Sequence, residues 1–183
     1  MSNRRARFAK IGSNIDLRGN IGGSLGFARL ASYMCAGRIA IGHSLTPRRL
    51  RNGYDPKALP RVPMPRSRPE LLFTLVRFSF RDKSVMLLTQ GLGTQPFHKR
   101  IVLLVNEWTN SAAEMVTNFA AENRLATIVG QKTRGNVLGA MNFKVGSGYW
   151  LRLPVIGWYT SKGQSLEGRG LIRMSQSKSL PTL

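Results

Sequence analysis

Two segments of the chain contain residue types that could carry chemistry. Residues 18–23 read Arg-Gly-Asn-Ile-Gly-Gly and lie between a short apolar stretch and a helical pattern. Glycines at such a turn allow backbone N–H groups to point into a cleft and approach a ligand closely. The second segment contains Ser111 at the expected start of a helix, where the helix field favours developing negative charge. The N–H of the next residue, Ala112, could then donate to an oxyanion.

Each segment also has a purely structural interpretation. The glycine-rich segment can be a tight strand-to-helix turn, and its spacing fits neither a phosphate-binding loop nor a dinucleotide fingerprint. Nucleotide binding is therefore not expected. The run Ser111-Ala112-Ala113-Glu114 has the spacing of a capping box, which needs no catalysis. Spacing alone leaves both interpretations open for each segment.

The elements that must position these residues follow from the apolar pattern. Strands are predicted at residues 14–17, 100–105, 127–130 and 149–155, and helices from Ser24 to Gly37, at 71–80, and from Ser111 onward. This alternation favours an α/β layered fold. Residues 44–69 contain six prolines and seven basic residues, which predicts an extended basic, proline-rich insertion rather than a packed element.

Composition limits the remaining classes. The 183 residues correspond to about one domain, with a formal net charge of +20. A single cysteine, Cys35, excludes an internal disulfide, and only two histidines make a zinc centre or other metal site unexpected. No apolar run is long enough to cross a bilayer. No apolar segment follows the basic start, so the chain as written is expected to be cytoplasmic, although a longer parent protein could be exported.

Four motifs occur in a fixed order at residues 16–23, 111–114, 129–135 and 163–170. In this order they resemble the catalytic domain of the C-terminal processing (tail-specific) serine peptidases, a family that includes tricorn-type proteases. The resemblance covers residues 14–170. It implies a crotonase-like α/β core, incomplete at both ends, that hydrolyses peptide or protein substrates through an acyl-serine. No metal or organic cofactor is implied.

The resemblance implies specific roles for several residues. Ser111 would be the nucleophile, and the amides of Ala112 and Gly22, with Gly23 as the second choice, would form the oxyanion hole. In the lysine-dyad members the base follows the serine by about 25 residues, just after the Thr-x-Gly motif. Asn136 occupies that position here, so this dyad is absent.

The general base is therefore not identified. Lys132 matches a family lysine that is not the catalytic one. The chain is closer to the tricorn and interphotoreceptor-retinoid-binding branch, which lacks the lysine and pairs a histidine with a carboxylate. Glu167 lies in the motif where that carboxylate is expected. The histidine should precede the glycine-rich segment, whereas His43 and His98 follow it and are expected to be surface or loop residues.

Both ends depart from the family pattern. Residues 1–13 form a basic N-terminus expected to be disordered, and residues 171–183 a polar tail unlike the family. We expect that a frameshift or a misplaced start truncated a longer peptidase, in which case the isolated chain could be inactive.

Three other functions were weighed. The first is a basic binding module on the same fold, but aromatic residues are not interleaved with the charges of residues 44–69, so nucleic acid is not the expected partner. The second is a subtilisin-like order of Asp16, His43 and Ser111, in which the histidine lies in no recognisable motif. The third is a crotonase-type enzyme acting on acyl thioesters, which would leave the serine motif unexplained.

Overall fold

The computed structural model describes residues 12–23, 25–67, 69–70, 72, 82–93, 97 and 99–171. The helix predicted at residues 71–80 lies outside the described residues except for Leu72. His98 and residues 172–183 of the polar tail also lie outside them. The chain order is β1 (Ser13–Asp16), α2 (Gly26–Tyr33), β2 (Ala40–Leu45), α3 (Pro47–Arg51), η1 (Pro56–Ala58), β3 (Arg61–Pro63), β4 (Val85–Leu88), β5 (Ile101–Val105), α5 (Ala112–Glu122), β6 (Thr127–Gly130), β7 (Gly139–Gly146) and β8 (Tyr149–Thr160).

The first sheet has three parallel strands in the order β1-β5-β6. The central strand β5 consists of Ile, Val and Leu only, and its alternate residues Ile101, Leu103 and Val105 are almost fully buried. Strands β5 and β6 were predicted from their apolar runs and β1 from its place before the glycine-rich turn, and all three are confirmed. Because the strands are parallel, the turns that follow them emerge at one edge of the sheet.

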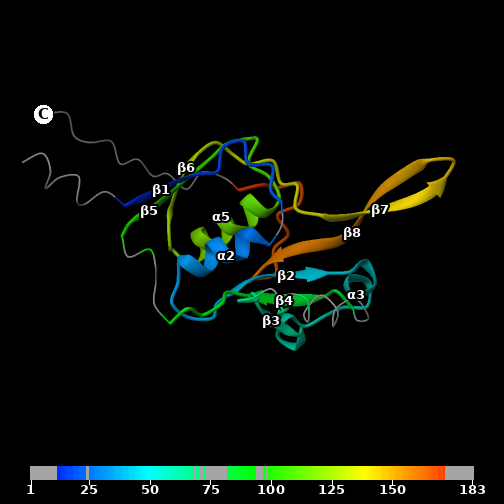
Figure 1. Ribbon diagram of the computed structural model, residues 1–183, viewed down its shortest axis with the longest axis horizontal. Coiled ribbons are helices and arrows are strands. Elements are labelled where there is room, and N and C mark those ends of the chain that lie inside the picture. Colours follow the sequence, from blue (N-terminus) through cyan, green and yellow to red (C-terminus); the bar gives the residue numbers. More distant parts are fainter. Residues whose placement is uncertain are drawn as a thin grey trace, which may run out of the picture.

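The second sheet is mixed and has the order β3-β4-β2-β8-β7. Helices α2 and α5 lie between the two sheets, which gives a mixed α/β layered architecture (Figure 1). Small residues such as Ala28, Ala31 and Ala120 are fully buried, which allows the helices to pack closely, and Phe119 and Met34 fill the space between the layers. The main core therefore lies between the layers and includes the buried face of α5, and a smaller apolar cluster forms around Leu45, Leu59 and Met86.

Strand β8 is longer than the predicted strand at residues 149–155. Its last four residues pair with β2, whereas residues 149–156 pair only with β7. Strand β7 and this part of β8 form a two-stranded ribbon, residues 139–156, which we call the arm. Figure 1 shows the arm projecting beyond the body of the molecule.

The prediction that residues 44–69 contain no packed element is wrong. Helix α3, the 3₁₀ helix η1 and strand β3 form in this range, and β3 pairs in parallel with β4. The prolines start these elements, because Pro47 and Pro56 occupy first-turn positions where no N–H is needed. Thr46 and Asp55 cap the two helices through their side chains. Leu59 and Met64 are buried, which anchors the segment. Whether the range is an insertion relative to the family stays a prediction.

Strands β2, β4 and β7 were not predicted. None of the described helices has the length and hydropathy needed to cross a bilayer.

Candidate active site

The site lies at the edge of the first sheet where β1, β5 and β6 end. Two of the three turns at this edge are tied to one another. The Gly19 N–H donates to Asn106 Oδ1 at 3.0 Å, and the Asn110 N–H donates to the Asn20 carbonyl oxygen at 2.9 Å. The two segments singled out in the sequence, about ninety residues apart, therefore form one structure.

The closest approach between these turns is at Gly22. A Cβ atom on Gly22 would lie 2.6 Å from the Ser111 Cβ and 3.0 Å from the Ala112 nitrogen. Gly22 also has a φ of +92°, a conformation that favours glycine. No larger residue fits here without displacing Ser111, which explains why glycine occupies this position.

Ser111 has a strained backbone at the apex of the turn between β5 and α5. Its φ is 49° and its ψ is −116°, and it is one of three non-glycine residues with positive φ in the described part of the chain. Such strain persists only where the surrounding structure holds it, and it clusters at functional sites. Ser111 is half-buried and stands at a sharp strand-to-helix turn at the start of the helix, the arrangement of the nucleophile elbow in α/β-hydrolases.

Two backbone amides beside Ser111 are free to donate. The Gly22 N–H donates to Asn20 Oδ1 at 2.9 Å. In contrast, neither Gly23 nor Ala112 donates its N–H to any protein acceptor within the described residues. Of the two glycine amides considered from the sequence, the one at Gly23 is therefore available without rearrangement.

Glu114 is fully buried, and its carboxylate connects the turn at Ser111 to the turn after β6. Its Oε1 accepts hydrogen bonds from Thr133 Oγ1 at 2.6 Å and the Gly135 N–H at 2.7 Å. Its Oε2 accepts from the Ser111 N–H at 3.0 Å and the Asn136 N–H at 3.1 Å. The capping-box spacing indicated the link to Ser111 but not the links to the turn after β6.

The position where the resemblance implies a lysine is thereby placed next to the serine. The backbone nitrogens of Ser111 and Asn136 donate to the same oxygen atom of Glu114. Asn136 is exposed, so its side chain occupies space at the site edge rather than the core. Lys132, on the same turn, is also exposed and makes no hydrogen bond within the described part of the chain.

Glu167 reaches the same turn from the C-terminal side. Its Oε2 accepts a hydrogen bond from the Val137 N–H at 2.7 Å, and the neighbouring Gly168 N–H donates to the Gly135 carbonyl oxygen at 2.8 Å. Within the described residues, no histidine, lysine or carboxylate side chain forms a hydrogen bond with the Ser111 hydroxyl. The structure thus brings Glu167 to the turn beside the site but not into contact with the serine.

The expectation that His43 is a surface or loop histidine is wrong. His43 lies in β2 between β4 and β8 and is fully buried. Its ring stacks on Tyr159 with a centroid separation of 5.5 Å, and its Nε2 lies 3.2 Å from the Tyr54 hydroxyl. Burial lowers the pKa of the His43 imidazole below its usual 6.5, so the neutral form is favoured.

Asp16 also binds another residue, Arg18, and not Ser111. The Arg18 side chain donates to its carboxylate and forms an ion pair at 2.8 Å, which lowers the pKa of Asp16 to about 2. Neither Asp16 nor His43 forms a hydrogen bond with Ser111, so the subtilisin-like order of these residues has no counterpart in space. Within the described residues, no group of three His, Cys, Asp or Glu side chains could hold a metal ion.

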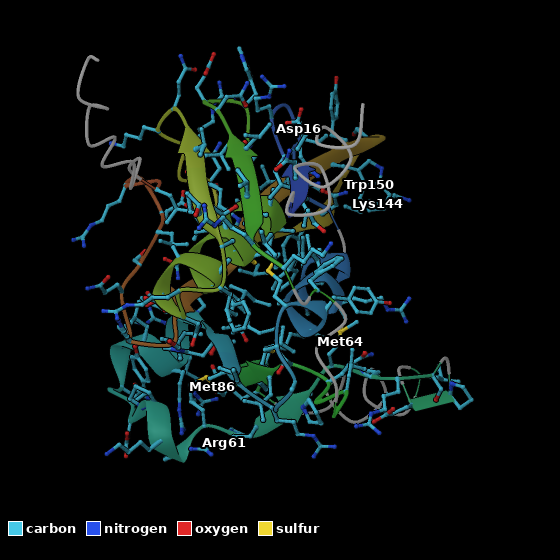
Figure 2. All side chains as sticks on the ribbon, turned by 90° about the vertical axis from the view of Figure 1, so that its left-hand side faces the viewer. Asp16, Arg61, Met64, Met86, Lys144 and Trp150 are labelled. Carbon is cyan, nitrogen blue, oxygen red and sulfur yellow. The ribbon has the colours of Figure 1, made fainter. Side chains whose placement is uncertain are left out.

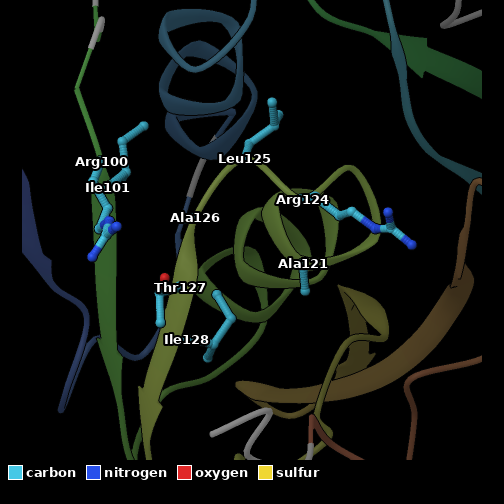
Figure 3. Close-up of a pocket in the computed structure, with 8 residues that line it drawn as sticks. All are labelled: Arg100, Ile101, Ala121, Arg124, Leu125, Ala126, Thr127 and Ile128. Atoms are coloured by element: carbon cyan, nitrogen blue, oxygen red, sulfur yellow. The ribbon is translucent and has the colours of Figure 1, made fainter. Parts of the chain in front are cut away.

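A pocket of about 300 Å³ opens beside the free amides. Gly22, Gly23 and Ala112 form its rim, and Phe27, Leu30 and Val116 give it an apolar wall. A separate pocket of about 550 Å³ lies where β5 and β6 begin, lined by Ile101 and Thr127 among others (Figure 3). Because this is the opposite edge of the sheet, that pocket is unrelated to the serine.

Residues 12–173 match peptidase family S41. A carboxy-terminal-processing protease of Bartonella bacilliformis is 31 % identical over 91 residues, which are 50 % of this chain and 21 % of that protein. Among solved structures, a photosystem II D1 C-terminal processing protease superposes with a TM-score of 0.60 at 18 % identity and covers 93 % of this chain and 35 % of its own. A putative peptidase from Parabacteroides merdae superposes with a TM-score of 0.62 at 18 % sequence identity. The superposition covers 92 % of this chain and 45 % of the Parabacteroides chain.

The match with the Bartonella protein therefore spans about a fifth of that relative, and the superposed structures extend well beyond this chain. The two solved structures support the mixed α/β fold. The family match covers most of the chain and includes all four motifs found in the sequence. The chain belongs to peptidase family S41, the C-terminal processing peptidases, and lacks the lysine of its lysine-dyad members.

Proposed function

We propose that this chain is a serine-type peptidase domain that cleaves peptide bonds through an acyl-enzyme on Ser111. The observation that carries the proposal is the close approach of Gly22 to the strained Ser111, at a pocket that the unpaired amides of Gly23 and Ala112 both line. The layered arrangement with helices between sheets supports a crotonase-like core as the finer description of the fold.

The chemistry follows from this geometry. The Ser111 oxygen attacks the substrate carbonyl carbon, its proton passes to a base, and the carbonyl oxygen becomes an oxyanion. The N–H groups of Ala112 and Gly23 donate to that oxyanion, and the start of α5 adds its field. The Gly22 N–H joins them only if it leaves Asn20. Collapse of the oxyanion expels the leaving amine, which takes up the proton held by the base. Water then gives a proton to the same base, attacks the ester and releases the acid from Ser111 as the base returns the proton to the serine oxygen.

The adjoining pocket indicates the substrate class. Phe27, Leu30 and Val116 form an apolar wall, which suits an apolar side chain of the substrate. We propose that the residue on the acyl side of the scissile bond is apolar and lies in this pocket.

The residue that accepts the Ser111 proton is not identified, and a serine hydroxyl is a weak nucleophile without such a base. Asparagine at position 136 cannot accept a proton at neutral pH. The domain is therefore proposed to bind and orient a peptide but to acylate slowly. This makes the base a testable part of the proposal.

The test is to restore a base at position 136. Asn136→Lys should raise the rate of Ser111 labelling by a fluorophosphonate at least tenfold, since general-base catalysis contributes about 10²- to 10⁴-fold. Gln131→Lys places the same side chain on another exposed position of this turn and should leave the rate unchanged. Ser111→Ala should abolish labelling in every background.

Labelling is read by mass spectrometry of the modified peptide, and folding by circular dichroism. Equal rates for Asn136→Lys and Gln131→Lys in folded protein would show that position 136 does not face the serine, and the proposal would be withdrawn.

A further inference from the structure

The arm has one entirely apolar face. In the register of β7 and β8, Met141 is opposite Leu153 and Phe143 is opposite Leu151, and opposite residues point to the same side of a sheet. Val145 and Tyr149 continue this face to the tip. The exposed fractions are Met141 44 %, Leu153 42 %, Phe143 42 %, Leu151 47 %, Val145 58 % and Tyr149 72 %. Exposure is thus greatest at the tip, farthest from the body.

The opposite face carries an aromatic ring and two cations. Lys144 is opposite Trp150, and Asn142 is opposite Arg152. Trp150 is 65 % exposed, and Figure 2 shows its side chain next to that of Lys144. The tip therefore has large apolar groups on both faces, with positive charge placed immediately behind it.

The charge around the arm selects the kind of partner. No Asp or Glu occurs from residue 123 to 166, while six Lys and Arg residues do, and the whole chain carries +20. A second copy would bring the same positive charge and repel the first. An anionic bilayer instead offers phosphates for the cations and an apolar layer for the rings. Tyr and Trp favour that interface, and nearby cations strengthen attraction to acidic lipids.

We propose that the arm binds anionic membrane surfaces by inserting its tip into the interfacial layer. Tyr149, Trp150 and Val145 enter the boundary between headgroups and acyl chains, and Lys144 and Arg152 contact lipid phosphates. This function is separate from the proposed hydrolysis and requires no chemistry at Ser111. The surface would hold the domain at a membrane and confine its substrates to those present there.

The first test is sedimentation of the full chain with phosphatidylcholine vesicles, with and without phosphatidylserine. Wild type should bind the anionic vesicles and not the neutral ones. The double variant Tyr149→Ser/Trp150→Ser should bind at least tenfold more weakly. Trp108→Ser, which removes a 52 % exposed aromatic ring outside the arm, should change binding less than twofold. Lys144→Gln/Arg152→Gln should weaken binding more than the pair Lys57→Gln/Arg61→Gln, two exposed cations elsewhere.

The second test measures depth. Cys35 is only 4 % exposed, so a thiol-reactive fluorophore can be attached selectively to Ser147→Cys at the tip. Its emission should shift to the blue with anionic vesicles and be quenched by brominated acyl chains, whereas the same label on Lys57→Cys should not respond. This readout stays informative if one of the double variants fails to fold.

Several results would overturn the proposal. The first is that the emission of the fluorophore at position 147 does not change with anionic vesicles, while Lys144→Gln/Arg152→Gln and Lys57→Gln/Arg61→Gln lose binding equally. This combination indicates general electrostatic attraction and not insertion of the tip. A second is a lipid-free dimer in sedimentation velocity that Tyr149→Ser/Trp150→Ser disrupts, which assigns the apolar face to a second copy. A third is binding to polyglutamate, but not to vesicles, that depends on Tyr149 and Trp150, which assigns an acidic polypeptide.

Discussion

The carboxylate of Glu114 stands at the centre of the candidate site and connects parts of the chain that are distant in sequence. Removing a charge from water is costly unless hydrogen bonds replace the lost hydration. Four donors do so here, two at each oxygen. One of them is the N–H of Ser111, so the same interaction that stabilises the buried charge also holds the strained serine in place.

Replacing Glu114 with Gln should therefore lower the free energy of unfolding strongly. The side-chain amide would direct a donor toward two existing donors and remove their acceptor, and hydrogen bonds to charged groups contribute about 1.5–3 kcal/mol each. We expect a loss of about 2–4 kcal/mol in urea denaturation.

The control for that variant is Glu122→Gln, at a half-buried carboxylate that accepts from Ser161 Oγ. It should lose less than about 1 kcal/mol. Equal losses in the two variants would show that Glu114 has no special role in holding the turn at Ser111 to the turn after β6.

The sequence selected the candidate residues of the site but not the hydrogen bonds that connect them. Ser111, Ala112 and the glycines could be selected because their types and order are informative. The hydrogen bond from the Gly19 N–H to the Asn106 side chain, and the oxygen of Glu114 shared by Ser111 and Asn136, could not be predicted. Both depend on how separate turns approach one another, and no spacing pattern encodes that approach.

At the level of elements, the predicted strands are those marked by a continuous apolar run, as at residues 100–105 and 127–130, by alternation, as at residues 149–155, or by a following glycine turn, as at residues 14–17. Strand β2 was missed because Ala40-Ile41-Gly42-His43-Ser44-Leu45 shows no alternation and contains small and polar residues. It lies between β4 and β8, and all its residues except Ala40 are buried, so neither face is marked by exposed polar side chains. Close packing against β8 explains why β2 has a glycine at position 42. A Cβ on Gly42 would lie 2.6 Å from the Tyr159 carbonyl oxygen and 2.7 Å from the Trp158 ring.

Two glycine-to-alanine substitutions should then have opposite effects. Gly42→Ala forces β2 away from β8 and should destabilise the protein by about 1–3 kcal/mol, the usual range for overpacking. Gly26→Ala, in the first turn of α2 with nothing within 4 Å of the added Cβ, should stabilise it by up to about 1 kcal/mol. Thermal unfolding followed by circular dichroism distinguishes them, and a stable Gly42→Ala protein would contradict the tight β2–β8 contact.

For the whole molecule, the two sheets have different roles. The parallel sheet β1-β5-β6 positions the serine, the free amides and Glu114 at one edge. The mixed sheet completes the core through β2 and extends outward as the arm. A fold of this kind can retain its core and its site edge when the residue at position 136 changes, because Asn136 is exposed and contributes only its backbone N–H to the hydrogen bonds of Glu114.

The buried His43 makes the stability of the whole molecule depend on pH. Burial lowers its folded-state pKa below 6.5, so the unfolded chain binds a proton first as the pH falls. Stability from neutral His43 is fully present above about pH 6.5 and declines below it, with a slope of at most about 1.4 kcal/mol per pH unit. Urea denaturation between neutral and mildly acidic pH should show this decline in wild type and a flatter profile in His43→Gln. His98→Gln, which changes the only other histidine, is the matched comparison, and a slope that disappears in His98→Gln but persists in His43→Gln would contradict the assignment.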